Sequence, residues 1–222
     1  MSWCSPIMWH DNVSLPRDLY DKICSTVSQK LEGTRTIDTG KVYYTSYTED
    51  DSTWSRDILE GLTGFYEQLF VSRMMFQLGM LERSEWKFNY WIQGSNCNTI
   101  GHKPHTHFSG NEIISWCHII KAPIPDEPCF HFFRNTSKGT IDGEGYRTVF
   151  GSVYEKLYPE QKTGDINAWP AWSMHAVDAT SSEENRIVIA GNISLEKMTD
   201  GESIMEHKRD GKTVTWDIKE LA

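Results

Sequence analysis

The feature that most constrains the fold is a change of hydrophobic period near residue 86. Before it, apolar residues recur every three to four positions. After it, short segments rich in β-branched and aromatic residues alternate with Gly, Pro, Asn and Asp. The first pattern is typical of amphipathic helices and the second of strands. A chain of 222 residues with this order is predicted to form a β-sandwich or small barrel that carries helices on one face.

Two helices are predicted before the change. The first spans residues 14–33, with Ser14 as the N-cap, Pro16 just inside it and Gly33 as the stop. Its apolar residues are spaced four apart and share one face: Leu15, Leu19, Ile23, Val27 and Leu31. The second helix covers residues 51–81, where Gly61 and Gly64 weaken the helical pattern.

Seven or eight strands are predicted after the change. The segments are WKFNYWIQ from residue 86, EIISWCHIIK from 112, CFHFF from 129, YRTVFGSVY from 146, DINAW from 165, HAVDA from 175, RIVIAGNISL from 186 and TVTWDI from 213. No repeat or linker interrupts them. We therefore expect a single domain, 1–222, in which residues 1–85 form a helical support and residues 86–222 form the β core.

Composition narrows the classes of function. The net charge of −9 disfavours nonspecific binding to nucleic acid, which needs clustered Lys and Arg. No segment resembles a signal peptide or is apolar enough to span a bilayer, so no membrane role is expected. The five cysteines are Cys4, Cys24, Cys97, Cys117 and Cys129. Their odd number and wide spacing predict free thiols in a reducing cytoplasm. Homo-oligomerisation stays open.

A cluster of histidines gives the strongest functional signal. His105 and His107 form an H-x-H triplet before an apolar strand, and residues two apart in extended chain point to the same side. His175 opens a later strand, and Arg186 begins another. An arginine at the end of a buried strand requires an anion. Two histidines and a carboxylate on one face of a metal, with open positions opposite, are typical of non-haem iron oxygenases.

Three segments, HTHFSGNEIISWCHIIKAP, GDINAWPAWSMHAV and RIVIAGNISL, together resemble the 2-oxoglutarate and Fe(II)-dependent dioxygenases. The pattern is similar to their His-x-Asp/Glu…His…Arg signature, most of all in the small prolyl-hydroxylase-like branch found in bacteria and phages. The resemblance covers about residues 86–195. It implies a double-stranded β-helix core of the jelly-roll or cupin-like type, braced by the N-terminal helices.

The resemblance also implies cofactors and roles. Fe(II) would be bound by His105, His107 and His175, and Arg186 would bind the 5-carboxylate of 2-oxoglutarate. The implied reaction consumes 2-oxoglutarate and dioxygen, releases succinate and CO2, and hydroxylates a C–H bond of an unidentified substrate, either a small molecule or a protein side chain.

Two positions depart from the signature. His107 stands where the family usually has a carboxylate, so Glu112 or Asp165 could supply an oxygen ligand instead. The serine that commonly follows the arginine by two positions is Val188 here. Another residue must then contact 2-oxoglutarate, and the candidates are Tyr90, Asn98 and His118.

The remaining histidines carry weaker signals, and two other functions stay open. His102 is interpreted as a loop residue that could serve as a substitute ligand, and His118 as a core or pocket residue. A cupin-like enzyme with a three-histidine site would not use 2-oxoglutarate. A non-catalytic β-sandwich would use the metal only for stability.

Overall fold

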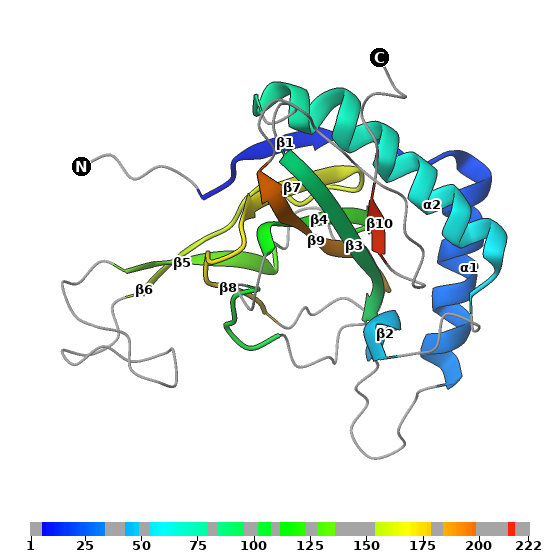
Figure 1. The fold of residues 1–222 in the computed structure, drawn as a ribbon. Coiled ribbons are helices and arrows are strands. Elements are labelled where there is room, and N and C mark those ends of the chain that lie inside the picture. The colour runs from blue at the N-terminus through cyan, green and yellow to red at the C-terminus, as the bar shows by residue number, and fades with distance from the viewer. Residues whose placement is uncertain are drawn as a thin grey trace.

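The computed structural model describes residues 6–33, 43–48, 54–79, 84–95, 102–107, 112–122, 128–135, 154–178, 184–198 and 213–215. Within these ranges the chain forms two sheets and two principal helices (Figure 1).

The larger sheet forms the centre of the molecule. Its strands follow the order β1-β7-β4-β9-β3-β10, and β2 also pairs with β3. Every pairing that the structure describes in this sheet is antiparallel. The strands are β1 (Trp9–Asn12), β2 (Tyr43–Thr45), β3 (Ser84–Ser95), β4 (Glu112–Lys121), β7 (Asp165–Pro170), β9 (Arg186–Met198) and β10 (Thr213–Thr215).

The smaller sheet has the order β6-β5-β8, with β5 (Phe130–Asn135), β6 (Tyr154–Leu157) and β8 (His175–Val177). The 102–107 segment extends its edge, because the backbones of His105 and His175 exchange N–H···O bonds of 3.0 and 3.1 Å. From β4 onward the chain crosses repeatedly between the two sheets. This path confirms the predicted double-stranded β-helix core.

The helices cover one side of the larger sheet, away from β5, β6 and β8 (Figure 1). Helix α1 (Arg17–Gly33) confirms the first predicted helix and begins directly after Pro16. All five residues of its predicted apolar face are buried. Helix α2 (Arg56–Leu69) continues into the π-helical η3 (Phe70–Met75), which the sequence pattern does not reveal. A short 3-10 turn, η1 (Ser46–Thr48), precedes α2.

The N-terminal part of the chain contributes strands as well as helices. β1 pairs with β7 and β2 pairs with β3, so both add to the larger sheet. β1 was not predicted, because it is only four residues long and too short for a periodic signal. The strand expected at 146–154 falls mostly outside the described residues. The division of one domain at residue 86 stays a prediction.

The two faces of the larger sheet have different environments. The face under the helices is apolar and buried, with Trp86, Phe88, Tyr90 and Ile92 from β3 and Ile114, Trp116 and Ile120 from β4. On β9 this face includes Gly191, where any Cβ would collide with the Asn89 carbonyl oxygen and the ring of Trp116. The opposite, inner face looks toward the smaller sheet and carries the candidate site.

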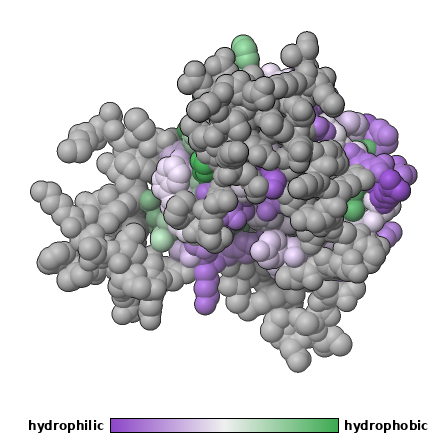
Figure 2. Space-filling view, viewed as in Figure 1, coloured by the Kyte–Doolittle hydropathy of each residue, from purple (hydrophilic) through white to green (hydrophobic). Residues whose placement is uncertain are grey.

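The surface is consistent with the sequence composition. In the view of Figure 2, hydrophilic side chains dominate the described surface at the right edge, where α1 lies in Figure 1. Among the helices that the structure describes, none is both long and apolar enough to cross a membrane. Cys24, Cys117 and Cys129 are free thiols, as predicted. Cys4 and Cys97 lie outside the described residues.

Candidate metal centre

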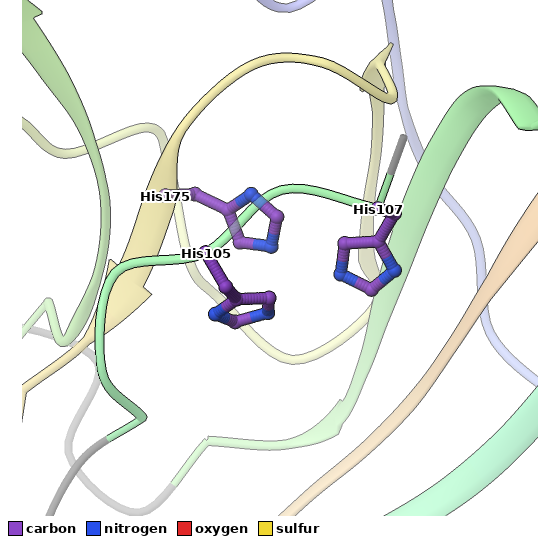
Figure 3. Close-up of side chains that lie close together, drawn as sticks. All are labelled: His105, His107 and His175. Carbon is purple, nitrogen blue, oxygen red and sulfur yellow. The ribbon is translucent and has the colours of Figure 1, made fainter. Parts of the chain in front are cut away.

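Three histidine side chains converge between the two sheets (Figure 3). His105 and His107 come from the 102–107 segment, and His175 is the first residue of β8. Each offers one ring nitrogen, and these nitrogens all lie within 4.8 Å of one another. The ring centroids are 4.4 Å apart for His105 and His175, 5.0 Å for His107 and His175, and 5.1 Å for His105 and His107.

Backbone hydrogen bonds hold the three residues in place. His105 pairs with His175 across the edge of the smaller sheet. The N–H of His107 donates to the carbonyl of Ala171, 2.9 Å away, in the turn that joins β7 to β8. The H-x-H triplet is therefore fixed by backbone hydrogen bonds to the segment that carries the third histidine.

Two of the rings have one nitrogen engaged and the other available. The Nδ1–H of His105 donates to the carbonyl of Lys103 at 2.7 Å, and the Nδ1–H of His175 donates to that of Ser173 at 2.9 Å. A donor bond of this kind fixes the tautomer, so the lone pair of Nε2 remains free to bind a metal.

The third ring, His107, has a different environment. It stacks on Trp91 of β3, with ring centroids 5.7 Å apart and planes inclined by 8°. The side-chain amide of Asn192, on β9, lies close enough to act on the ring and raises its pKa slightly against the effect of burial.

The imidazoles of His107 and His175 are neutral at physiological pH. Burial, followed by the neighbouring His105, lowers the pKa of His107 to about 4. The same two causes lower the pKa of His175 well below its usual value. Since metal coordination requires neutral imidazole, these two rings are already in the protonation state that a cation needs.

A small cavity of about 50 Å³ adjoins the histidines. Arg186, the first residue of β9, lines it and is only 8% exposed. No carboxylate of the described ranges lies within ion-pair distance of its guanidinium. Trp169 also lines the cavity, and its buried indole N–H has no hydrogen-bond partner in the part of the chain that the structure describes. A buried cation and a buried free donor both favour an anionic ligand with oxygen atoms.

The donor set of the cluster contains nitrogen only. Within the part of the chain that the structure describes, neither Glu112 nor Asp165 belongs to the histidine group. Asp165 instead accepts hydrogen bonds from the Asn12 side chain at 2.6 Å and the Lys162 backbone at 2.7 Å. It belongs to a separate group with His10 and Glu160. The proposed substitution of an oxygen ligand for His107 therefore has no support from the structure.

Two of the residues predicted to contact 2-oxoglutarate face the wrong way. The Tyr90 hydroxyl lies on the helix side, where it donates to the Leu59 carbonyl at 3.1 Å. His118 also points to that side and contacts Tyr66. Asn98 lies outside the described residues. His102 lines the cavity beside His105 but is not part of the converging group.

Sequence reasoning missed several residues of the inner face. Arg186, Val188, Ala190 and Asn192 alternate along β9, so the position of Arg186 already implied that Asn192 shares its face. Trp91 and Trp169 gave no comparable signal, because both occur in segments that are apolar on both faces.

No protein-family model matches the sequence, and neither does any curated protein. Solved structures nevertheless share its fold. A prolyl-4-hydroxylase from Pseudomonas putida has a TM-score of 0.50 and 11% identity, over 85% of this chain and 92% of the other. AviO1 from Streptomyces viridochromogenes has a TM-score of 0.53 and 12% identity, over 83% and 88%.

A third similar structure is SnoN, a non-heme α-ketoglutarate-dependent epimerase from nogalamycin biosynthesis. It has a TM-score of 0.52 and 13% identity, over 83% of this chain and 78% of the other. These likenesses establish that the chain has the fold of 2-oxoglutarate and iron-dependent oxygenases.

Proposed function

We propose that the protein is a 2-oxoglutarate and Fe(II)-dependent oxygenase. In this proposal His105, His107 and His175 bind the iron, and Arg186 binds the far carboxylate of 2-oxoglutarate. The observation that carries it is that three imidazoles and one buried guanidinium meet at a single cavity, and that the guanidinium has no carboxylate partner among the described residues. The iron, when bound, supplies the activation of dioxygen that is coupled to decarboxylation of 2-oxoglutarate to succinate.

The residues of this chain prepare the site in three ways. The imidazoles present nitrogen donors whose tautomers are fixed by hydrogen bonds. Arg186 compensates the charge of the dicarboxylate. Phe130, Trp169 and Val188 form an apolar wall of the cavity, which excludes water and strengthens the pairing of charges inside it.

Hydroxylation of a C–H bond is the proposed outcome. The similarity to the P. putida prolyl-4-hydroxylase supports it, since the two chains match over 92% of that protein. SnoN, which is described as an epimerase, shows that the same fold also serves another outcome. Identifying the product therefore requires a different experiment from the one that tests the cofactors.

The test is a titration of the Fe(II)-loaded protein with 2-oxoglutarate under nitrogen. We expect a weak metal-to-ligand absorption band in the visible region, and release of succinate when oxygen is admitted. Arg186→Ala should weaken the affinity for 2-oxoglutarate about 100-fold, as expected for removal of a buried charge partner. Arg56→Ala removes an exposed arginine of α2 and serves as the control. Bound iron without the band would overturn the proposal.

A three-histidine enzyme that does not use a keto acid is the rival, and the all-nitrogen donor set favours it. It predicts that Arg186→Ala leaves turnover unchanged and that 2-oxoglutarate does not bind. A metal that raises the melting temperature without any turnover would instead indicate a purely structural site.

A further inference from the structure

Two large aromatic side chains are exposed next to the candidate metal centre. They are Tyr47 and Trp172, with exposed fractions of 66% and 59%. Among the described residues, the other large apolar side chains with this kind of exposure are Met8, Phe76 and Tyr158. A single exposed apolar side chain needs no explanation, whereas several gathered at a site indicate a binding surface.

Tyr47 is connected to the site by ring contacts. It lies in η1, and its ring is edge-on to that of Trp91, with centroids 5.5 Å apart and planes inclined by 75°. Trp91 lines the cavity and stacks in turn on His107. The main chain of η1 is fixed as well, because the Ser46 hydroxyl accepts a hydrogen bond from the Ile92 N–H at 2.9 Å. Tyr47 is therefore held in place, two ring contacts away from His107.

Trp172 is connected to the same site through the main chain. It lies in the turn that joins β7 to β8, and both of its neighbours in the sequence bond to candidate ligands. The Ala171 carbonyl accepts from the backbone N–H of His107, and the Ser173 carbonyl accepts from Nδ1–H of His175. The backbone of Trp172 is therefore fixed between two contacts to the histidines, while its side chain is largely open to solvent.

The size of the cavity and its charge limit what can bind beside these rings. The cavity of about 50 Å³ is much smaller than the roughly 300 Å³ at which pockets for drug-sized molecules begin. The substrate must therefore lie at the mouth, outside the space that the co-substrate fills. Within the described part of the chain, Arg186 is the only arginine, lysine or carboxylate residue that lines the cavity. The proposed function assigns Arg186 to 2-oxoglutarate, so no charged group there remains for the substrate.

We propose that Tyr47 and Trp172 form the substrate-binding rim of the site, and that the substrate presents an uncharged, flat, unsaturated ring to them. Aromatic side chains bind other flat rings by offset stacking and by edge-to-face contact. They also attract cations, but a cation at this rim would approach Arg186 without a carboxylate of the described lining to compensate its charge. This inference rests on the proposed function, because it names the substrate class of the same site.

Binding of 2-naphthol to the metal-free protein, followed by NMR titration, tests the class of substrate. This probe is flat and is uncharged at neutral pH. Decahydro-2-naphthol has the same carbon skeleton and hydroxyl group, but it is saturated and not flat. We expect 2-naphthol to bind at least about 10-fold more tightly, since only a flat ring can stack on both side chains. Equal affinity for the two probes, or tighter binding of 2-naphthyltrimethylammonium, would overturn the inference.

Substitutions test the two residues. Tyr47→Ala and Trp172→Ala should each weaken 2-naphthol binding about 5- to 10-fold, because each removes one ring contact. Trp172→Phe, which keeps a ring, should recover most of the affinity. Phe76→Ala is the matched control, since Phe76 follows η3 on the helix side, is 70% exposed, and should not affect binding. Equal losses in all three alanine variants, or no loss in Tyr47→Ala and Trp172→Ala, would overturn the inference.

The position of the bound probe separates this inference from the proposed function. Paramagnetic Co(II) at the three histidines would shift and broaden the NMR lines of nearby protons, and diamagnetic Zn(II) is the control. We expect the lines of bound 2-naphthol to shift with Co(II) and not with Zn(II). Unshifted lines beside Co(II) that is shown by its visible absorption to be bound would overturn the inference. Failure of Co(II) to bind would instead overturn the proposed function, while the titrations of the metal-free protein still decide whether Tyr47 and Trp172 bind flat rings.

Discussion

A buried histidine lies on either side of the larger sheet, and the two are used in opposite ways. On the helix side, His118 is 1% exposed and both of its nitrogens are bonded. Nδ1 accepts from the Tyr66 hydroxyl at 2.9 Å, and Nε2–H donates to the Val13 carbonyl at 3.0 Å. On the inner side, His175 is 3% exposed and bonds one nitrogen to Ser173, while the other faces two imidazoles. The two histidines are equally buried, and it is the second ring nitrogen of His175, left available to a ligand, that distinguishes the functional residue.

The same contrast holds for two tryptophans whose indole N–H groups have no hydrogen-bond partner among the described residues. Trp116 also borders the cavity, but its ring packs against Tyr66 and Phe70 on the helix side. Trp169 lines the cavity, with its ring centroid 5.2 Å from that of His175. We therefore expect only Trp169 to respond to a ligand.

The largest expected effect is the loss of metal binding in His175→Ala. Removing one of three protein ligands should weaken Fe(II) or Co(II) affinity at least about 100-fold, measured by titration. The unfolding free energy of the metal-free protein should change much less. His118→Ala should retain its metal affinity, and a loss there equal to that of His175→Ala would remove the distinction between the two faces.

The effect of His118→Ala should instead be a lower free energy of unfolding. It leaves the Tyr66 hydroxyl and the Val13 carbonyl without partners and opens a cavity, so we expect the unfolding free energy to fall by about 3 kcal/mol. Urea denaturation of the metal-free protein measures it. A change below about 1 kcal/mol would show that the two hydrogen bonds of His118 do not hold β4 against the helices.

Acid should destabilise the metal-free protein through the same residue. Burial lowers the pKa of His118 to about 4, whereas in the unfolded chain it is about 6.5. Between these values only the unfolded state binds the proton, so stability present above pH 6.5 is lost as the pH falls. The expected loss from pH 7 to 5 is about 2 kcal/mol. His118→Gln should remove this contribution in denaturation curves, and an unchanged pH dependence would contradict it.

The smallest effect separates the two tryptophans. Trp169→Phe removes one hydrogen-bond donor from the cavity and should weaken 2-oxoglutarate binding about 5-fold, close to 1 kcal/mol. Trp116→Phe should leave that affinity unchanged. Isothermal titration of the Fe(II)-loaded variants under nitrogen compares them, and equal effects in both would contradict the assignment of the free indole donors to different faces.

Much of the fold could be predicted because the burial pattern is periodic. The spacing of Leu19, Ile23 and Val27 predicts α1, since a helix buries one face. The segment 112–121 is predicted with its observed limits. The four-residue β1 and the π-helical turn η3 could not be predicted, because one is too short for a period and the other changes only hydrogen-bond register.

The site could be predicted in part. His105, His107 and His175 were grouped from spacing and resemblance, and the structure brings them together. The face of the sheet on which each side chain lies was harder to predict. Tyr90 is two residues from the buried Phe88, and residues two apart in a strand share a face, so the strand pattern already placed Tyr90 on the helix side. His118 lies in a strand that is apolar on both faces, where alternation gives no information. Asn192 could not be linked to His107, because their contact joins chain segments far apart in the sequence.

The most direct test of the account is a crystal structure with Fe(II) and 2-oxoglutarate bound under nitrogen, with anomalous diffraction at the iron edge. We expect one iron peak at about 2.0–2.2 Å from a ring nitrogen of each of His105, His107 and His175. We also expect a carboxylate of 2-oxoglutarate against Arg186. An iron peak at His10, Glu160 and Asp165 instead, or 2-oxoglutarate away from Arg186, would contradict it.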